Sequence, residues 1–370
     1  MLSMVFELLT VSTLAVTCAA HWAPRPTPGP QHPAADHVTY TTVKGFFLQD
    51  EDTTVPATFD YTAQNFGLIN RTYPTDNKCD RSFTQWQKFE HYVDTLNKRG
   101  GKNVDYKVLF LGRHGEGYHN VAESYYGTPA WNCYWSLLDG NGTSVWADAH
   151  ITPNGVAQAE KAANYWASRI TLQKIPLPES YYTSPLTRCL ETASLTFSKL
   201  PLPRKQPFIP TVKEFFREGI SGHTCDRRSS KTYIHNSFPT YKFERGFSEQ
   251  DLLFEEDFAE QSIDQDIRSK IVLDDVFGSD ENTWLSVTSH SGEIASLLRG
   301  KFSLHSSGEM GGMLIKDLVL GHQDFRLSTG AVIPVLVKAE TIKGDAPVTS
   351  TVAWSSISTC STVPPLPTAT

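Results

Sequence analysis

The stretch VLFLGRHGEGYHN, residues 108–120, is an apolar run that ends in an arginine, a histidine and a glycine. Four consecutive apolar residues at 108–111 are typical of a strand buried on both faces of a sheet. Polar residues at the carboxyl end of such a strand lie where open α/β sheets bind ligands. A guanidinium such as Arg113 can hold a phosphate through paired hydrogen bonds, and a neutral His114 can attack phosphorus in line. Taken alone, however, the segment is more simply explained as an ordinary strand end.

Two further strand-to-helix junctions carry the same types of residue. TSPLTR at 183–188 places Arg188 in the first turn of a helix, and TSHSG at 288–292 places His290 just before another. Helix amino termini attract anions. Two arginines and two histidines at one end of a sheet would form a pocket for a dianion, with no metal needed to neutralise its charge. The three junctions together therefore predict a phosphate-binding active site.

Apolar runs alternate with helical patterns along the central part of the chain. Thr152 and Pro153 suit the N-cap and the first position of a long helix. We expect strands at 108–111, 181–183, 208–216, 285–289 and 331–337, and helices starting at Pro153, Ser184–Pro185, Ser248–Asp251 and Ile294. This order predicts an α/β fold, a three-layer α/β/α sandwich on a mostly parallel sheet.

The two ends of the chain differ in composition from its centre. An apolar run and the small residues before His21 predict a signal peptide, although Glu7 interrupts the run and a short membrane anchor is the alternative. No stable membrane span is expected. The predicted organisation is a signal peptide at 1–20, a Pro-rich linker at 21–37, a catalytic domain at 38–343 and a Ser/Thr/Pro-rich tail at 344–370.

The expected export agrees with two glycosylation sequons, at Asn70 and Asn141, and predicts a secreted or cell-wall protein. Removal of the signal peptide would leave an odd set of cysteines, so at least one is free or pairs with another chain. Any four of them could pair in about three ways, and the sequence does not choose between these. The remaining cysteines are Cys79, Cys133, Cys189, Cys225 and Cys360.

The composition excludes some classes of function. The chain has 370 residues, of which 39% are hydrophobic, enough for one large core. With 33 basic and 40 acidic residues its net charge is -7, the wrong sign for a general nucleic-acid binder. No cysteine or histidine pair has zinc-finger spacing, so a structural metal is not expected. His119, His223 and His235 could in principle bind a metal, but no further ligand completes a recognisable spacing.

Three motifs resemble those of the histidine phosphatase superfamily. They are R-H-G-x-x-x-x-N at 113–120, S-P-x-x-R-x-x-x-T at 184–192 and S-H at 289–290, and the resemblance spans roughly residues 104–337. FREGISG at 216–222 is similar to an element of the phosphoglycerate mutase-like branch, and 217–228 is similar to a fungal group of mutase-like proteins. The acid phosphatase and phytase branch is disfavoured, because its motifs continue differently after the early histidine and end in His-Asp.

The resemblance implies a role for each motif residue. His114 would be the nucleophile that forms a phosphohistidine. Arg113, Arg188 and His290 would bind the phosphoryl oxygens, with His290 also part of the catalytic set. Glu218 would be the proton donor and acceptor, since an alkoxide leaving group needs a proton. The two arginines should keep His114 unprotonated. The superfamily fold and the absence of a cofactor are implied as well.

Several assignments stay open from the sequence. Glu214 is a rival proton donor on the same segment as Glu218. Asn120 is expected to contact the phosphate, and Tyr118 is expected to lie close to it. The aromatic-rich insertion at 128–150 would be either a lid over the pocket or a surface insertion with its own small cluster.

The sequence thus predicts a metal-independent phosphomonoester hydrolase that acts on a small phosphorylated substrate. One alternative is a mutase-like phosphotransferase, although export would separate it from intracellular mutase substrates. A second is a catalytically silent phosphate-binding protein, which is disfavoured because a complete set of charged groups is costly to hold together without use. A third, a cell-wall structural protein suggested by the tail, would not need paired arginines and histidines at strand ends.

Overall fold

The computed structural model describes residues 36–78, 82–299, 320–346 and 351–367. The expected signal peptide, most of the Pro-rich linker and Cys79 lie outside these residues. The central feature is a seven-stranded sheet in the order β1-β8-β2-β7-β3-β4-β5. Its strands are β1 (His37–Thr42), β2 (Val104–Arg113), β3 (Ser180–Thr183), β4 (Thr211–Val212), β5 (Lys242–Phe243), β7 (Trp284–Ser289) and β8 (Val332–Ile342).

The sheet is mostly parallel, as the sequence predicted. β2, β7, β3, β4 and β5 run in the same direction, and β8 is antiparallel to both of its neighbours, β1 and β2. The strand expected at 331–337 exists as part of β8, which lies inside the sheet between β1 and β2. Two short strands, β6 (Phe258–Ala259) and β9 (Ser355–Ser356), form a separate antiparallel ribbon.

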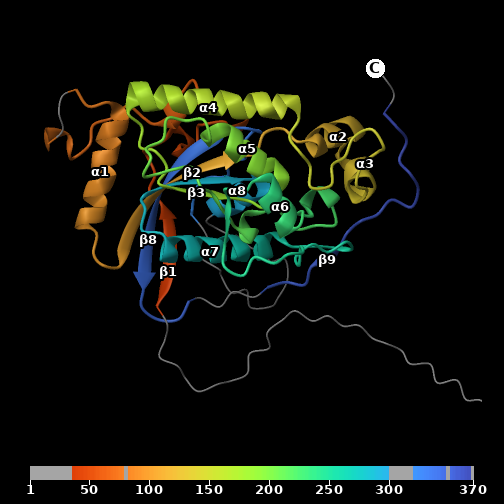
Figure 1. Cartoon of the computed structure of the whole chain (residues 1–370). Helices are drawn as coiled ribbons and strands as arrows, with labels where there is room; N and C mark the ends of the chain where they lie inside the picture. Colours follow the sequence, from red (N-terminus) through yellow and green to blue (C-terminus); the bar gives the residue numbers. More distant parts are fainter. Residues whose placement is uncertain (1–35, 79–81, 300–319, 347–350, 368–370) are drawn as a thin grey trace, which may run out of the picture.

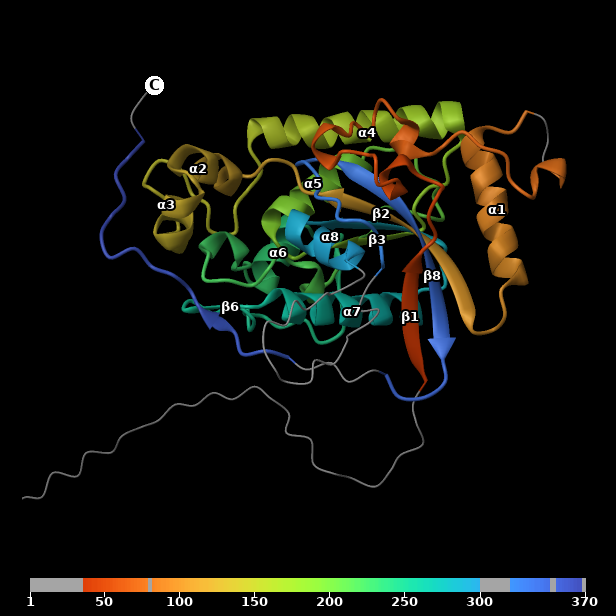
Figure 2. The ribbon, with the colours of Figure 1, turned by 180° about the vertical axis from the view of Figure 1, so that it is seen from behind.

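Helices cover both faces of the sheet. In Figures 1 and 2, α4 lies along one side of the sheet and α7 along the other, which gives the three layers of an α/β/α sandwich. None of the described helices is long and apolar enough to cross a membrane. The helices are α1 (Gln85–Arg99), α2 (Tyr118–Tyr126), α3 (Thr128–Cys133), α4 (Pro153–Gln173), α5 (Thr187–Phe197), α6 (Lys231–Ser237), α7 (Ser262–Ser279) and α8 (Ser291–Leu298).

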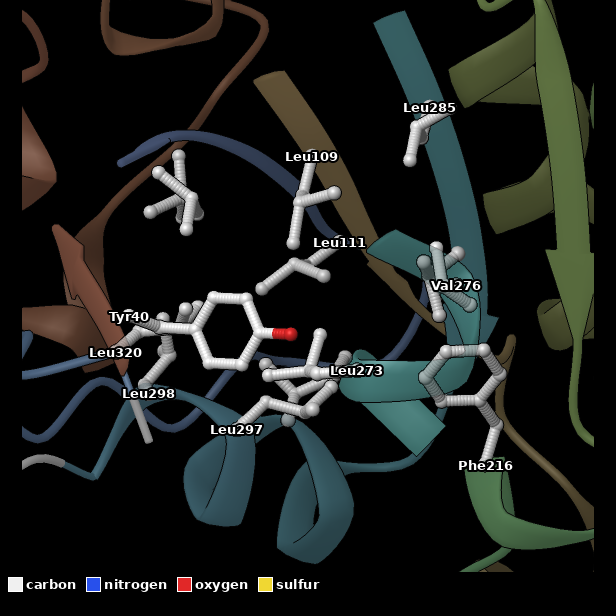
Figure 3. Close-up of a cluster of buried hydrophobic side chains, with 14 of the residues drawn as sticks. Tyr40, Leu109, Leu111, Phe216, Leu273, Val276, Leu285, Leu297, Leu298 and Leu320 are labelled. Atoms are coloured by element: carbon white, nitrogen blue, oxygen red, sulfur yellow. The ribbon is translucent and has the colours of Figure 1, made fainter. Parts of the chain in front are cut away.

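Strand β2 is buried on both faces, because its alternate side chains enter two different cores. Val108 and Phe110 pack with aromatic residues of α1 and α4. Leu109 and Leu111 pack on the opposite side with apolar residues of α7 and α8 (Figure 3). This arrangement explains the uninterrupted apolar run at 108–111. It also fixes the end of β2, and therefore Arg113, within the sheet.

Some of the predicted helix and strand boundaries agree with the structure and others do not. The helix start at Thr152 is confirmed: its hydroxyl accepts a hydrogen bond from the Gly155 amide at 3.1 Å, and Pro153 is the first helical residue. The strand expected at 208–216 is wrong for most of its length, since only Thr211–Val212 pair with neighbours.

The helix expected from 248–251 is also wrong. The Asp251 carboxylate does accept hydrogen bonds from nearby amides, those of Leu253 at 3.0 Å and Phe254 at 3.1 Å. The same carboxylate forms an ion pair with Arg217 at 2.7 Å, so it anchors a loop to the core instead of starting a helix. The next helix, α7, begins only at Ser262.

Candidate active site

The ends of β2 and β7 bring two predicted histidines together. The His114 amide donates to the carbonyl oxygen of Ser289 at 3.0 Å, which continues the parallel pairing of the two strands. His290 follows directly, and the ring centroids of His114 and His290 are 5.1 Å apart. Both side chains are buried, with exposed fractions of 2% and 0%. The strand-end histidines therefore meet at one edge of the sheet.

The hydrogen bond of His114 determines which of its ring nitrogens is protonated. Its Nδ1 lies 2.7 Å from the carbonyl oxygen of Gly115, and a carbonyl only accepts. Nδ1 therefore holds the proton of the neutral ring, and Nε2 keeps a free lone pair. Burial lowers the pKa of His114 well below its usual value, and the positive charges of Arg188 and Arg113 lower it further. The neutral, nucleophilic form is thus the stable one.

Gly115 allows the loop after His114 to approach the start of α4. Its amide donates to the Thr192 hydroxyl on α5 at 2.9 Å. A Cβ atom at Gly115 would lie 2.5 Å from the carbonyl oxygen of Gly155 in the first turn of α4. Because backbone atoms leave no room for a side chain, only glycine fits here.

Arg188, in the first turn of α5, is held by three groups. Its Nη2 forms an ion pair with Asp226 at 3.1 Å, and its Nη1 donates to the carbonyl oxygen of Cys225 at 2.5 Å. Its Nε donates to Nδ1 of His290 at 3.3 Å. The side chain is only 1% exposed. Arg188 is therefore a rigid, pre-positioned cation.

His290 has partners at both ring nitrogens. Since its Nδ1 accepts from Arg188, its Nε2 carries the proton, and this nitrogen lies 2.8 Å from the Ser184 hydroxyl. Burial and then the charge of Arg188 lower the pKa of His290 well below its usual value. His290 thus orients Arg188 through one ring nitrogen and faces the Ser184 hydroxyl with the other.

The start of α5 differs from the expected cap at Ser184–Pro185. The helix begins at Thr187, and Asp148 caps it from a distant part of the chain. The Asp148 carboxylate accepts from the Thr187 amide at 2.8 Å and from its hydroxyl at 2.8 Å. Sequence reasoning missed this residue, because nothing local marks an acidic group 39 positions before the helix. Asp148 positions the backbone of the turn that carries Arg188.

Arg113 differs from Arg188 in having no carboxylate partner among the described residues. One guanidinium nitrogen, Nη1, donates to the carbonyl oxygen of Leu327 at 2.8 Å. Its Nε is buried and has no hydrogen-bond partner in that part of the chain. Burial lowers the pKa of Arg113, and the charge of Glu218 opposes this effect. A partly buried cation with an unused donor is suited to bind an anion.

Glu218 lies at the amino terminus of α8. Its carboxylate accepts hydrogen bonds from the amides of Gly292 at 3.1 Å and Glu293 at 3.0 Å. A Cβ atom at Gly292 would lie 2.2 Å from Oε1 of Glu218, so glycine is required for this contact. The structure therefore brings Glu218 to the junction after β7, next to His290.

Glu214, the rival proton donor, belongs to a different network. Its carboxylate binds Arg217 Nη1 at 3.0 Å and Arg228 Nε at 2.9 Å. Asp251 binds the same Arg217, so the group forms a structural ion-pair cluster. Glu214 is committed to this cluster, whereas Glu218 binds the amides at the start of α8 and its charge acts on Arg113 and Arg188.

The residues shortly after His114 have mixed roles. The Asn120 side chain accepts from the Gly117 amide at 3.0 Å, which stabilises the start of α2, and no contact joins it to either arginine within the described residues. Tyr118 is partly exposed on the same helix. His119 is buried, and its ring centroid lies 5.4 Å from that of His114. Sequence analysis treated His119 only as a possible metal ligand and did not predict its position beside His114.

One possible metal-binding group occurs within the part of the chain that the structure describes. Donor atoms of His223, Cys225 and Asp226 lie within 4.8 Å of one another, and this group includes neither His119 nor His235. Asp226 is already paired with Arg188, and burial raises the pKa of the Cys225 thiol, which disfavours the thiolate that a metal needs. Asp226 and the backbone carbonyl of Cys225 therefore serve as partners of Arg188.

The insertion at 128–150, called the aromatic cap below, packs next to this group. Trp131, Trp146 and Ala149 of the cap form a buried cluster with Ala122 and Cys225. The cap is also joined to the far end of the chain by a disulfide between Cys133 and Cys360, while Cys189 and Cys225 are free and buried. The sequence left this pairing open, and it did not predict that the cap touches residues around Arg188.

Sequence comparisons relate the chain to a known family. The family model described as "Histidine phosphatase superfamily (branch 1)" matches residues 137–308, a range that contains Arg188, Glu218 and His290 and begins after His114. A "Probable phosphoglycerate mutase" of Arthroderma benhamiae is 51% identical over 84% of this chain and 87% of its own length. "Phosphomutase-like protein 3" of Candida albicans is 37% identical over 67% of this chain and 70% of its own.

Solved structures overlap with the chain only in part. A putative alpha-ribazole-5'-P phosphatase from Escherichia coli is 15% identical, with a TM-score of 0.34, and the match covers 65% of this chain and 96% of that one. A mycobacterial glucosyl-3-phosphoglycerate phosphatase is 18% identical, with a TM-score of 0.30, over 52% and 79% of the two chains. On the sequence relationships, the chain belongs to the histidine phosphatase superfamily, and its relatives are phosphoglycerate mutase-like proteins.

Proposed function

We propose that the protein is a metal-independent phosphomonoester hydrolase that works through a phosphohistidine on His114. The observation that carries this proposal is the pairing of a neutral His114, whose Nε2 is free, with Arg113, a cation without a carboxylate partner among the described residues. A nucleophile beside an unsatisfied guanidinium suits a substrate that is both an electrophile and an anion.

In the proposed reaction, Arg113 and Arg188 bind the non-bridging oxygens of the phosphate. His114 Nε2 attacks phosphorus as the bond to the ester oxygen breaks, and protonated Glu218 gives its proton to the leaving oxygen. Water then attacks the phosphohistidine, Glu218 takes up a proton from the water, and inorganic phosphate and free His114 are formed. This cycle uses Glu218 first as an acid and then as a base. It needs no cofactor.

A mutase reaction would use the same first step and then return the phosphoryl group to another hydroxyl of the bound product. The names of the relatives make this the second candidate. We favour hydrolysis because we also propose that the protein is exported. The Cys133–Cys360 disulfide supports export, since such bonds persist mainly in oxidising compartments.

The test is phosphate release from p-nitrophenyl phosphate at mildly acidic to neutral pH with excess EDTA. We compare the wild type with His114→Ala and with a control, His235→Gln, an exposed histidine on α6. Activity should survive chelation and the control substitution, and disappear in His114→Ala.

Equal activity in His114→Ala would exclude the proposed nucleophile. Phosphate binding without turnover would instead support the silent binding protein. Conversion of 3-phosphoglycerate to 2-phosphoglycerate without net phosphate release would support the mutase.

A further inference from the structure

The C-terminal residues 351–360, called the strap below, are attached to the body of the protein at several points. β9 of the strap pairs with β6, and the Ile357 amide donates to the carbonyl oxygen of Asp257 at 2.9 Å. The Val352 amide donates to the Asp264 carboxylate at 3.1 Å. The strap ends at Cys360, which is bonded to Cys133 in α3. In Figures 1 and 2 the C-terminal part of the chain runs past α3.

Two residues in the second half of the strap lie close to the segment 218–226, which carries the proposed proton donor and the partner of Arg188. Ile357 packs on Gly222: a Cβ atom there would lie 2.8 Å from the Ile357 Cδ1 atom. Cys360 holds α3 through the disulfide, and Trp131 of α3 lies in the buried cluster that contains Cys225. The strap thus contacts the segment directly and also through the aromatic cap.

The segment 218–226 in turn holds the catalytic arginine. Arg188 donates to the carbonyl oxygen of Cys225 and pairs with the carboxylate of Asp226. The cap reinforces the same turn, because the Thr224 hydroxyl donates to the carbonyl oxygen of Leu138 at 2.7 Å and the Thr224 carbonyl oxygen accepts from the Asp148 amide at 3.1 Å. A shift of this turn would therefore displace both groups that orient the guanidinium.

We infer that the Cys133–Cys360 disulfide and Ile357 are positioning elements for phosphate binding, acting through Asp226 on Arg188. This inference rests on the proposed function only in using the same oxyanion pocket. The strap belongs to a sequence region whose Ser/Thr/Pro composition would suggest a dispensable tail. Instead, loss of its attachment should loosen the turn at 225–226 and weaken the binding of a phosphoryl group.

The test compares wild type with a Cys133→Ser/Cys360→Ser double variant, which leaves neither of these thiols unpaired. Val363→Ala is the matched control, because Val363 is exposed and follows the end of the strap at Cys360. Calorimetry with inorganic phosphate gives Kd, and p-nitrophenyl phosphate gives KM and kcat, all well below each melting temperature. We expect Kd and KM to rise about fivefold or more in the double variant, with a smaller change in kcat, and no change in the control.

A double-mutant cycle tests the route of this effect. If the strap acts through Asp226, the loss of the disulfide should raise Kd much less in an Asp226→Asn background than in the wild type. Unchanged Kd and KM with a lower melting temperature would show a purely structural strap and overturn the inference, as would additive effects in the cycle. Ile357→Ala, which keeps the disulfide, should also raise Kd, and it provides the test if the double variant does not fold.

The two proposals fail in different ways. Wild type that binds phosphate but hydrolyses no ester would overturn the proposed hydrolase, while Kd would still test the strap. Wild type that neither binds phosphate nor hydrolyses an ester would overturn both.

Discussion

His114 Nδ1 lies 2.7 Å from the carbonyl oxygen of Gly115, the residue that follows it in the chain. This contact orients the ring of His114, which has no carboxylate partner among the described residues. A carboxylate in this place would stabilise the protonated imidazole and raise its pKa, whereas burial and two arginines lower it. The site therefore keeps a neutral histidine next to a strongly cationic pocket.

The first prediction concerns the protonation of His114. Because burial and the two arginines lower its pKa well below the usual value, the ring should stay neutral, with its proton on Nδ1, while free imidazole becomes protonated. Long-range 1H–15N NMR spectra should show pH-independent nitrogen shifts for His114, assigned by comparison with His114→Gln. Free imidazole in the same sample is the internal reference. A shift of the His114 signals along with that reference would contradict the structure.

The second prediction separates the two glutamates. Glu218→Gln should lower kcat about 100-fold or more for an alkyl phosphate, whose leaving group needs a proton. The loss should be much smaller for p-nitrophenyl phosphate, because its leaving group departs as a stable anion. Glu214→Gln, which alters the separate ion-pair cluster with Arg217 and Arg228, should show no such dependence on the leaving group. A comparable loss with both substrates would exclude Glu218 as the acid.

The third prediction concerns the orientation of Arg188. Asp226→Asn removes the charge of its partner but keeps the shape, and it should raise KM about tenfold, as expected for a weakened buried hydrogen bond between charged groups. Asp139→Asn is the matched control, because Asp139 pairs with the neighbouring Arg227 at the surface. Steady-state kinetics measure both. Equal KM values in the two variants would show that Asp226 does not position the arginine.

The parts of the site that follow from the sequence are those with local signals. The β2 run and the three strand-to-helix junctions place Arg113, His114 and His290 correctly, because each depends on neighbours in the chain. The parts that could not be predicted are distant partners. Asp226 lies 38 positions from Arg188, and Cys360 lies 227 positions from Cys133.

Competing partners also misled the prediction of secondary structure. Asp251 looks like a helix cap in the sequence, yet its carboxylate forms an ion pair with Arg217, and the chain there forms a loop. Similarly, Ser184 looks like the cap of α5, but its hydroxyl lies against His290 and Asp148 takes over the capping. In the first case a buried arginine and in the second a buried histidine ring binds the expected cap residue. These tertiary contacts override the local capping preference.

The last prediction is that the fold loses stability in acid. His114, His119 and His290 all have pKa values well below 6.5, so below this pH the unfolded chain binds protons that the folded chain does not. The stabilisation that these three histidines contribute is therefore fully present above pH 6.5, and it is lost as the pH falls towards their pKa values in the folded protein. Glu293 opposes one of these groups: burial raises its pKa to about 8, despite the nearby Arg268, so its contribution increases as the pH falls from 8.

Glu90 opposes a second histidine, because burial raises its pKa to about 7. Three histidines less two glutamates leave a net difference of one proton, which corresponds to about 1.4 kcal/mol per pH unit between pH 6.5 and 5.5 at most. Urea unfolding at these two pH values measures the difference. His119→Gln removes one buried titrating ring and should abolish most of this net difference. An unchanged pH dependence in His119→Gln would mean that His119 becomes protonated in the folded protein.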